Sequence, residues 1–246
     1  MIGTQRQSEI LEYIKQHQTI SVRKIVEKFY ISEATARRDL DALEKTGLIR
    51  RVFGGATLIE GSDKQIPLFV REREYGEEKD ELCEQATMFI RDGNILFLDG
   101  SSTVQFLLPY LKKFKDLVVI TNGLKMAQML SEMHIKVYLT GGLIMENSSV
   151  LIGPDTEDFI NRFNADICIL SCKGLSDDGK LTDTSYEETK LRKCYLKNAK
   201  KKIVLMTSQK LGKKYIHTLC TSDEVDHIIL PLSMREQYAF VSKRKT

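Results

Sequence analysis

The stretch SEATARRDLDALEKTGLIRRVFGGATL, residues 32–58, joins an amphipathic segment to a short apolar segment that carries two adjacent glycines. Ser32 is a favourable N-cap, and Gly47 can adopt the left-handed conformation that ends a helix, so we expect a helix from Ser32 to near Thr46. Residues 48–60 then have the pattern of two strands joined at Phe-Gly-Gly. The stretch therefore predicts a helix followed by a β-hairpin.

Two shorter helical patterns precede this stretch. Their apolar stripes are formed by Ile10, Leu11 and Ile14 and by Val22, Ile25, Val26 and Phe29. Three small helices followed by a hairpin is the order of a winged helix-turn-helix unit. We expect residues 1–58 to form this domain.

The third helix carries an arginine pair on its outer face. Helical spacing buries Ala36, Leu40 and Leu43 and turns Arg37 and Arg38 away from them, while Asp39 lies at the edge of the buried stripe. A carboxylate there is placed to pair with an arginine or a backbone group inside the unit. A single surface arginine is usually just solvated. Small residues at the helix start and a second pair, Arg50 and Arg51, in the hairpin favour DNA binding.

The composition of the chain excludes some classes of protein. Its net charge of +3, from 37 basic and 34 acidic residues, is too small to identify a nucleic-acid binder. Five cysteines without a CxxC pair favour reduced thiols in a cytoplasmic protein, and no metal site or cofactor is expected. No apolar window approaches the ~18 residues of a membrane span.

Residues 59–76 are polar apart from Ile66–Phe69, which are apolar enough to dock on the domain that follows, and we interpret this segment as a linker. From residue 77 to 246, apolar strand patterns alternate with helical ones. Strands of this kind predict a mostly parallel sheet covered by helices on both faces, an α/β domain.

Three strand ends in this domain carry hydroxyls or glycines. Such ends, where loops lead into helices, are where open parallel sheets bind ligands, and a helix N-terminus favours an anion. They are Asp99 with Ser101, Ser102 and Thr103, then Thr121 and Asn122, then Gly141 and Gly142. Each alone is also compatible with an ordinary cap or tight turn.

Charged groups follow later strands. Lys173 and Lys210 each follow an apolar strand, at the edge where a bound phosphate would need a cation. Glu188 and Arg192 are four residues apart on a predicted helix, a spacing usual for a modest surface salt bridge.

These motifs resemble the DeoR family of bacterial transcriptional regulators over essentially the whole chain. The N-terminal match is the RRDL helix, the GLIRR strand and the Gly-Gly turn, and the C-terminal match includes LDGSST, TNG, TGG, LTD and SQK. The resemblance implies a C-terminal domain similar in fold to ribose-5-phosphate isomerase that senses phosphorylated sugars. Phe53, where the family has histidine, and Thr207, where it has aspartate, depart from the pattern.

The resemblance carries roles to individual positions of this sequence. The DNA-binding candidates are Ser32, Thr35, Arg37, Arg38, Arg50, Arg51, Gly54 and Gly55. The effector-binding candidates are Asp99, Ser101, Ser102, Thr103, Thr121, Asn122, Gly141, Gly142, Lys173, Glu188 and Lys210.

We therefore expect a cytoplasmic repressor of sugar-metabolism genes that binds a double-stranded DNA operator as a homo-dimer or homo-tetramer. A phosphorylated sugar would control it, and the 77–246 domain would both sense this effector and assemble the oligomer. One alternative is a sugar-phosphate isomerase carrying a DNA-binding head, with Asp99 or Glu188 as general base. Another is a protein-protein adaptor whose head binds no DNA.

Overall fold

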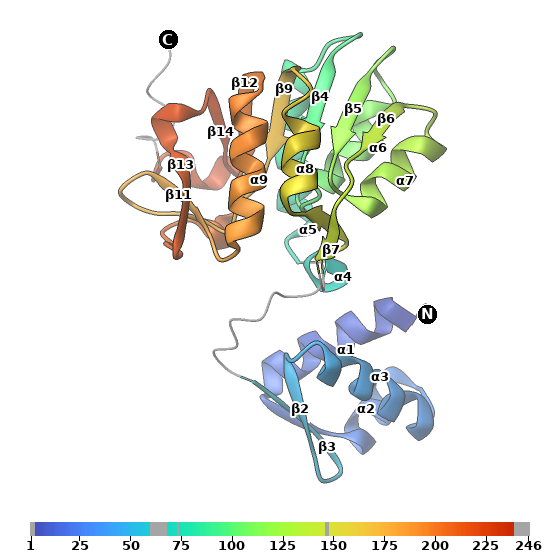
Figure 1. Ribbon diagram of the computed structural model, residues 1–246. Coiled ribbons are helices and arrows are strands. Elements are labelled where there is room, and N and C mark those ends of the chain that lie inside the picture. The colour runs from blue at the N-terminus through green and yellow to red at the C-terminus, as the bar shows by residue number, and fades with distance from the viewer. Residues whose placement is uncertain (1–2, 60–67, 73, 146–147, 239–246) are drawn as a thin grey trace. The chain divides into compact units, whose positions relative to one another are not determined.

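The structure, a computed structural model, describes residues 3–59, 68–72, 74–145 and 148–238 (Figure 1). The chain divides into two compact units, Met1–Glu74 and Tyr75–Thr246. Most of the predicted linker, residues 60–67 and 73, lies outside the described part of the chain.

The N-terminal unit packs three helices against a small antiparallel sheet. The helices are α1 (Gly3–His17), α2 (Val22–Phe29) and α3 (Glu33–Lys45). The strands β1 (Thr19–Ser21), β2 (Ile49–Val52) and β3 (Gly55–Leu58) lie in the order β1-β3-β2. The predicted apolar stripes form the core, with Ile10, Leu40 and Leu43 fully buried. Strand β1 was not expected, since three residues carry too little pattern to show a strand.

The ends of α3 and the hairpin turn follow the local chemistry of their residues. The Ser32 hydroxyl accepts a hydrogen bond from the Thr35 amide at 3.2 Å, and Gly47 has a φ of 72°. Gly54 turns the hairpin with a φ of 76°. A Cβ on Gly55 would lie 2.1 Å from the Ile20 carbonyl oxygen, so only glycine allows β3 to lie this close to β1.

A buried ion pair joins α1 to α3. Asp39 is 1% exposed, and its Oδ2 lies 2.5 Å from Nε of Arg6. Its Oδ1 accepts further hydrogen bonds from Arg6 at 3.2 Å and from the Gln7 side chain at 3.1 Å. The Asp39 hydrogen bond raises the pKa of Arg6. The expectation that Asp39 pairs inside the unit is confirmed.

Short helix α4 (Leu68–Arg71) packs within the N-terminal unit. Val70 is buried in that unit's core, and the Ser8 hydroxyl donates to the Phe69 carbonyl oxygen at 3.2 Å. The expected docking of this apolar segment on the following domain was therefore wrong for the residues that the structure describes. Val70 instead lines a groove beside α1 together with Tyr13 and Phe29.

The C-terminal unit is built on a six-stranded sheet in which every neighbouring pair is parallel, as predicted. The strand order is β14-β12-β9-β4-β5-β6. The bounds are β4 (Ile95–Leu98), β5 (Val118–Thr121), β6 (Lys136–Leu139), β9 (Ala165–Leu170), β12 (Ala199–Leu205) and β14 (His227–Ile229).

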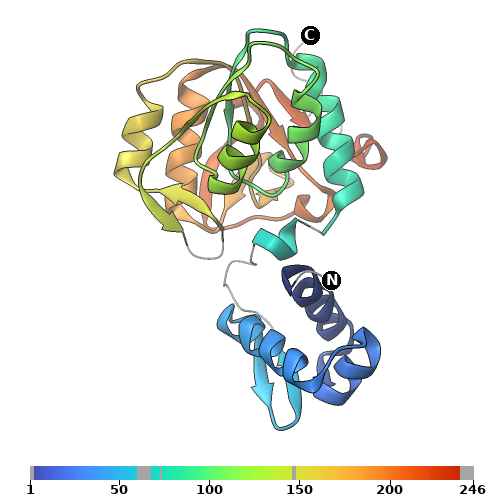
Figure 2. The same ribbon diagram turned by 90° about the vertical axis from the view of Figure 1, so that its right-hand side faces the viewer.

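Both faces of this sheet are covered (Figures 1 and 2). Alternate residues of β9 face opposite layers: Ile167 and Ile169 pack on one side, Cys168 and Leu170 on the other. One layer contains α5 (Gly76–Ala86), α6 (Leu108–Leu111) with the 3-10 turn Val104–Leu107, and α7 (Leu124–Glu132). The other contains α8 (Pro154–Ile160) and α9 (Tyr186–Lys197).

Two smaller antiparallel sheets were not expected. Strands β7 (Leu143–Met145) and β8 (Val150–Ile152) form one, and β10 (Gly174–Leu175), β11 (Lys180–Asp183) and β13 (His217–Thr221) form the other. Their strands are too short to show an alternating pattern in the sequence.

The strand order reverses between β4 and β9. From β4 the chain adds β5 and β6 on one side, whereas β9, β12 and β14 extend on the other. The carboxyl ends of β4 and β9 are therefore the point where the strand order reverses, which is the usual ligand position in such sheets.

The Arg6–Asp39 pair generates a stability prediction. Asp39→Ala leaves the Arg6 guanidinium without its partner, so the N-terminal unit should lose about 3 kcal/mol of its free energy of unfolding. Glu27→Ala, which breaks the exposed Arg23–Glu27 pair on α2, should cost below about 1 kcal/mol. Native-state hydrogen exchange of α3 peptides in the full chain measures both changes. Equal protection of the α3 amides in the two variants would contradict a stabilising role for the Arg6–Asp39 pair.

Candidate DNA-binding and effector sites

Of the two arginines on the outer face of α3, one pairs with a carboxylate of the same helix and the other has no such partner among the described residues. Nε of Arg37 donates to Glu33 at 3.0 Å, one turn earlier on the same helix. Arg38 is exposed and makes no hydrogen bond or ion pair with any residue that the structure describes. Ser32 and Thr35, whose hydroxyls lie 2.9 Å apart, are occupied as the helix cap. Arg38 is thus the residue of this group most available to a DNA base or phosphate.

The two hairpin arginines also differ. Arg50 is exposed on β2, whereas Arg51 ties the hairpin to α3. The Arg51 guanidinium donates to the Gly55 carbonyl at 3.2 Å and the Arg37 carbonyl at 3.3 Å, and it pairs with Asp41. Arg51 therefore has an internal role that the sequence did not indicate. At the hairpin tip, Gly54 follows the fully exposed Phe53.

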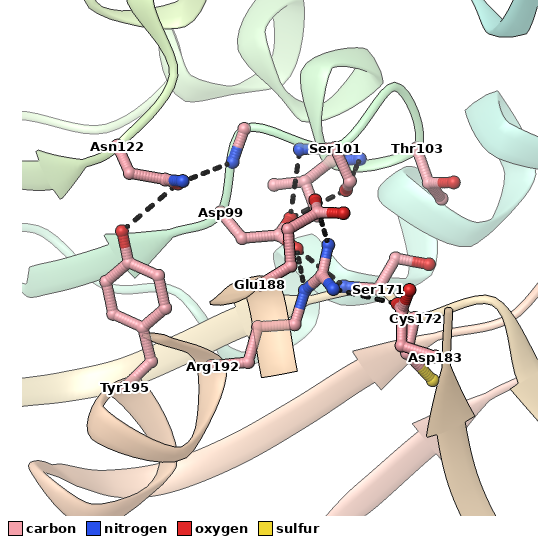
Figure 3. Close-up of polar contacts among 12 residues, drawn as sticks. Asp99, Ser101, Thr103, Asn122, Ser171, Cys172, Asp183, Glu188, Arg192 and Tyr195 are labelled. Carbon is pink, nitrogen blue, oxygen red and sulfur yellow. Dashed lines mark hydrogen bonds and ion pairs between the residues drawn. The ribbon is translucent and has the colours of Figure 1, made fainter. Parts of the chain in front are cut away.

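Arg192 is the centre of a buried ion cluster at the carboxyl end of the parallel sheet (Figure 3). Its three guanidinium nitrogens each donate to a different carboxylate. Nε lies 3.0 Å from Asp99, Nη1 2.8 Å from Asp183 and Nη2 3.0 Å from Glu188. The carboxylates come from the β4 end, from β11 and from α9, so one side chain joins three elements.

Asp99 lies at the point where the strand order reverses. Its Oδ1 accepts the Ser101 hydroxyl at 2.6 Å and the Ser101 amide at 3.2 Å. Its Oδ2 accepts Arg192 and the amide of Ser171, which follows β9, at 3.3 Å. Both carboxylate oxygens are therefore in use, and Asp99 links the loops after the two diverging strands.

Lys210 brings a second cation to the same edge. Its ammonium donates to the Ser171 hydroxyl at 2.6 Å and to the Thr103 hydroxyl at 3.2 Å. Burial lowers the pKa of Lys210 to about 8, an effect that nearby Asp99 and Asp183 oppose and Arg192 reinforces. Beside it, the Thr207 hydroxyl is buried and makes no hydrogen bond with the described residues. The site therefore offers an ammonium and hydroxyls to an anion, next to carboxylates that can accept hydrogen bonds.

Thr121 and Asn122 shape the loop after β5. The Thr121 hydroxyl accepts the Gly123 amide at 3.1 Å. The Asn122 Oδ1 accepts the Gly100 amide at 3.0 Å and the Tyr195 hydroxyl at 3.3 Å, as Figure 3 shows for the tyrosine. A Cβ on Gly100 would lie 2.8 Å from the Gly123 Cα, so the loops after β4 and β5 touch through their backbones.

The remaining candidates lie farther along the edge or to its side. Gly141 and Gly142 follow β6, two strands from β4, and bind α8: the Gly141 carbonyl accepts the Thr156 hydroxyl at 2.6 Å. Gly142 has a φ of 124°, and a Cβ there would lie 2.1 Å from that hydroxyl. Ser102 is buried in the loop after β4, and Lys173 is half-buried after β9.

Sequence reasoning missed several members of the cluster. It does not single out Asp183, Ser171 or Tyr195. The surface salt bridge that is usual for the spacing of Glu188 and Arg192 does not occur, because both residues are buried. A signal was present, because Glu188, Arg192 and Tyr195 follow one another at i, i+4 and i+7, the spacing of a single buried helix stripe. Charged residues on such a stripe indicate an internal ion pair.

Removing the central guanidinium should be costly. Arg192→Met leaves three carboxylates facing one another without a cation, so we expect a loss of more than about 3 kcal/mol in the free energy of unfolding. Lys190→Met on the same helix breaks the outer contact to Glu157 at 3.2 Å and a cation–π contact with Tyr186, and it should cost much less than the loss of Arg192. Denaturant unfolding of the full chain compares the two variants, and similar midpoints would contradict a central role for Arg192.

Known proteins share both units of this chain. Residues 6–62 match the model of the DeoR-like helix-turn-helix domain, and residues 74–230 match the DeoR C terminal sensor domain. None of the described helices has the length and apolar character needed to cross a membrane.

Two relatives align with nearly the whole chain. The HTH-type transcriptional regulator GolR of Listeria innocua is 32% identical, with 93% of this chain and 91% of that protein covered. The glycerol-3-phosphate regulon repressor of Escherichia coli is 30% identical over 93% and 90%. Among solved structures, a ribose-5-phosphate isomerase bound to phospho-erythronic acid aligns over 55% of this chain and 54% of its own, with a TM-score of 0.43 and 16% identity. The chain belongs to the DeoR family of DNA-binding transcriptional regulators.

Proposed function

We propose that this regulator is a repressor of sugar-metabolism genes whose hold on its operator is controlled by a phosphorylated sugar or related metabolite bound near Asp99 and Lys210. The observation that carries the proposal is the Lys210 ammonium held by two hydroxyls at the carboxyl ends of β4 and β9. A half-buried cation at the carboxyl edge of a parallel sheet is suited to a phosphate group. The Glu188 carboxylate of the adjoining ion cluster is suited to a sugar hydroxyl.

The same geometry argues against the enzymatic alternative. A general base needs a carboxylate oxygen that is free to accept a proton from substrate. Both oxygens of Asp99 already accept hydrogen bonds, one of them from Arg192. The two full-length relatives are named as transcriptional regulators, and one of them as the repressor of a glycerol-3-phosphate regulon. A pocket that senses a metabolite without consuming it fits this arrangement.

Assembly follows from the size of the DNA-binding unit. A recognition helix and hairpin contact few base pairs, so specificity requires paired half-sites and at least two copies of the head. We propose that residues 77–246 assemble a cytoplasmic homo-dimer or homo-tetramer for this purpose. The head, residues 1–58, would contact DNA through Arg38 and Arg50 as the exposed cations, with Ser32, Thr35, Arg37, Gly54 and Gly55 shaping the surface and Arg51 holding the hairpin in place.

Arg38 generates a DNA-binding prediction. If its guanidinium reads a base edge, Arg38→Ala should weaken binding to a fragment of the protein's own promoter by about 1 to 3 kcal/mol. Lys112→Ala, which removes an exposed cation of the C-terminal unit, is the matched control and should leave the affinity unchanged. Gel-shift titration at constant salt measures both. An unchanged affinity for Arg38→Ala removes this residue from the contacts.

Lys210 generates a ligand-binding prediction. Glycerol 3-phosphate, ribose 5-phosphate and fructose 6-phosphate are compared with their unphosphorylated parents in a thermal-shift assay. We expect at least one phosphorylated compound to raise the melting temperature, since a ligand of the native state stabilises it by mass action. Lys210→Ala should abolish this shift and the release of promoter DNA while preserving DNA binding. No shift with any phosphate in the wild type, or turnover of the compound, would overturn the proposed function.

The same assay has a pH dependence. The pKa of Lys210 is lowered to about 8, so its ammonium loses its proton as the pH rises through this value. The melting shift caused by the phosphorylated compound should therefore shrink above pH 8 and persist below it.

A further inference from the structure

Helix α5 is bonded to the short segment that carries Lys210. Lys210 ends a 3-10 turn, Ser208–Lys210, that follows β12. The Glu78 carboxylate on α5 accepts the Ser208 amide at 2.8 Å and the Ser208 hydroxyl at 2.7 Å. Two charge-assisted hydrogen bonds to one residue fix both its backbone and its side chain. Glu78 thereby holds the start of the turn that presents the ammonium.

The same helix also contacts the other loop that binds Lys210. The Cys83 thiol, whose pKa is raised by burial and which therefore stays protonated, donates to the Thr103 carbonyl oxygen at 3.3 Å. The Thr103 hydroxyl accepts the Lys210 ammonium. Residues of α5 thus bond to both loops between which Lys210 lies. A shift of Lys210 relative to Thr103 changes the contacts of α5 at two points.

Helix α5 is also the first element after the boundary between the units. It begins at Gly76 and is preceded by Tyr75, which has a φ of 58°, a strained conformation for a residue with a side chain. Directly before the boundary, the Glu74 carboxylate accepts the Lys15 ammonium of α1 at 2.5 Å. Helix α1 is in turn joined to α3 by the Arg6–Asp39 pair. Bonded contacts therefore lead from Lys210 to residue 76 in one unit and from residue 74 to the recognition helix in the other.

We propose that Glu78 is a positioning residue that fixes Lys210 through Ser208 and makes α5 the element that reports occupancy of the effector site to the segment joining the two units. The proposal rests on the proposed function for the identity of the site, and it adds the route by which that site acts. An anion that binds the Lys210 ammonium competes with Ser171 and Thr103 for it. The turn Ser208–Lys210 then shifts, and Glu78 transmits this shift to α5. Ligand and DNA become coupled because each favours a different position of the same helix.

The first test needs no ligand. Glu78→Ala removes both bonds to Ser208, so hydrogen exchange in a peptide spanning 206–211 of the full-length protein should accelerate about tenfold. Glu77→Ala is the matched control, because Glu77 is the adjacent, exposed carboxylate and makes no hydrogen bond or ion pair with the described residues. Glu78→Gln, which retains one acceptor oxygen, should restore part of the protection. Equal exchange in the Glu78→Ala and Glu77→Ala proteins overturns the positioning role.

The second test measures coupling. It uses whichever of glycerol 3-phosphate, ribose 5-phosphate and fructose 6-phosphate shifts the wild-type melting temperature. At saturation this compound should weaken wild-type and Glu77→Gln binding to promoter DNA about tenfold. Glu78→Gln retains one of the two bonds to Ser208, so it should still show a melting shift while the compound weakens its DNA binding only about threefold.

The outcomes of the two tests separate the two proposals. If Glu78→Gln binds the compound and still releases DNA like the wild type, the coupling role of Glu78 is wrong and the proposed function stands. If no compound shifts the wild type, the proposed function fails, and the exchange measurement alone decides whether Glu78 positions Lys210.

Discussion

One guanidinium that binds three carboxylates determines how the C-terminal unit is arranged at the carboxyl edge of its parallel sheet. Arg192 lies on α9, and its partners Asp99, Asp183 and Glu188 come from the end of β4, from β11 and from α9 itself. Buried carboxylates are tolerated only when each has a partner, and desolvation makes such a cluster intolerant of the loss of its centre. Arg192 therefore fixes the positions of the loop after β4, the β10-β11-β13 sheet and α9 relative to one another.

The cluster also explains how the half-buried Lys210 can remain charged. An ammonium at a desolvated position loses its proton readily, and Arg192 lowers the pKa of Lys210 further. The carboxylates that surround Arg192 exceed it in charge, so they oppose this effect and keep a cation favourable. Under the proposed function, binding of an anion at Lys210 depends on this balance of charge.

Much of this structure was predictable because local chemistry and global fold agree. The apolar stripes of the three head helices, the Ser32 cap and the turn at Gly54 specify the N-terminal unit, and alternating apolar strands and helices specify the parallel sheet. Asp99 was also identifiable, since it follows a buried strand. The features that could not be predicted from the sequence depend on contacts between residues far apart in the chain. Asp183 and Ser171 join Asp99 and Lys210 only through the sheet order, and Glu78 meets Ser208 from 130 positions away in the chain. From the sequence alone, Arg51 could point either to DNA or to α3, and only its contacts with Arg37 and Asp41 decide between the two.

The contacts of Arg51 have a consequence for how this family of proteins can diversify. Two of its hydrogen bonds are accepted by main-chain carbonyls, those of Arg37 and Gly55, and two further contacts use α3 side chains: Asp41 pairs with the guanidinium and Glu44 accepts the Arg51 amide at 2.6 Å. Carbonyl oxygens are present whatever residue occupies the position. The outward side chains of α3 other than Asp41 and Glu44 can therefore be exchanged during evolution without removing a hydrogen bond between the hairpin and the helix. Specificity for a new operator sequence could then arise from substitutions on one face of α3, while the contacts that join the hairpin to this helix stay the same.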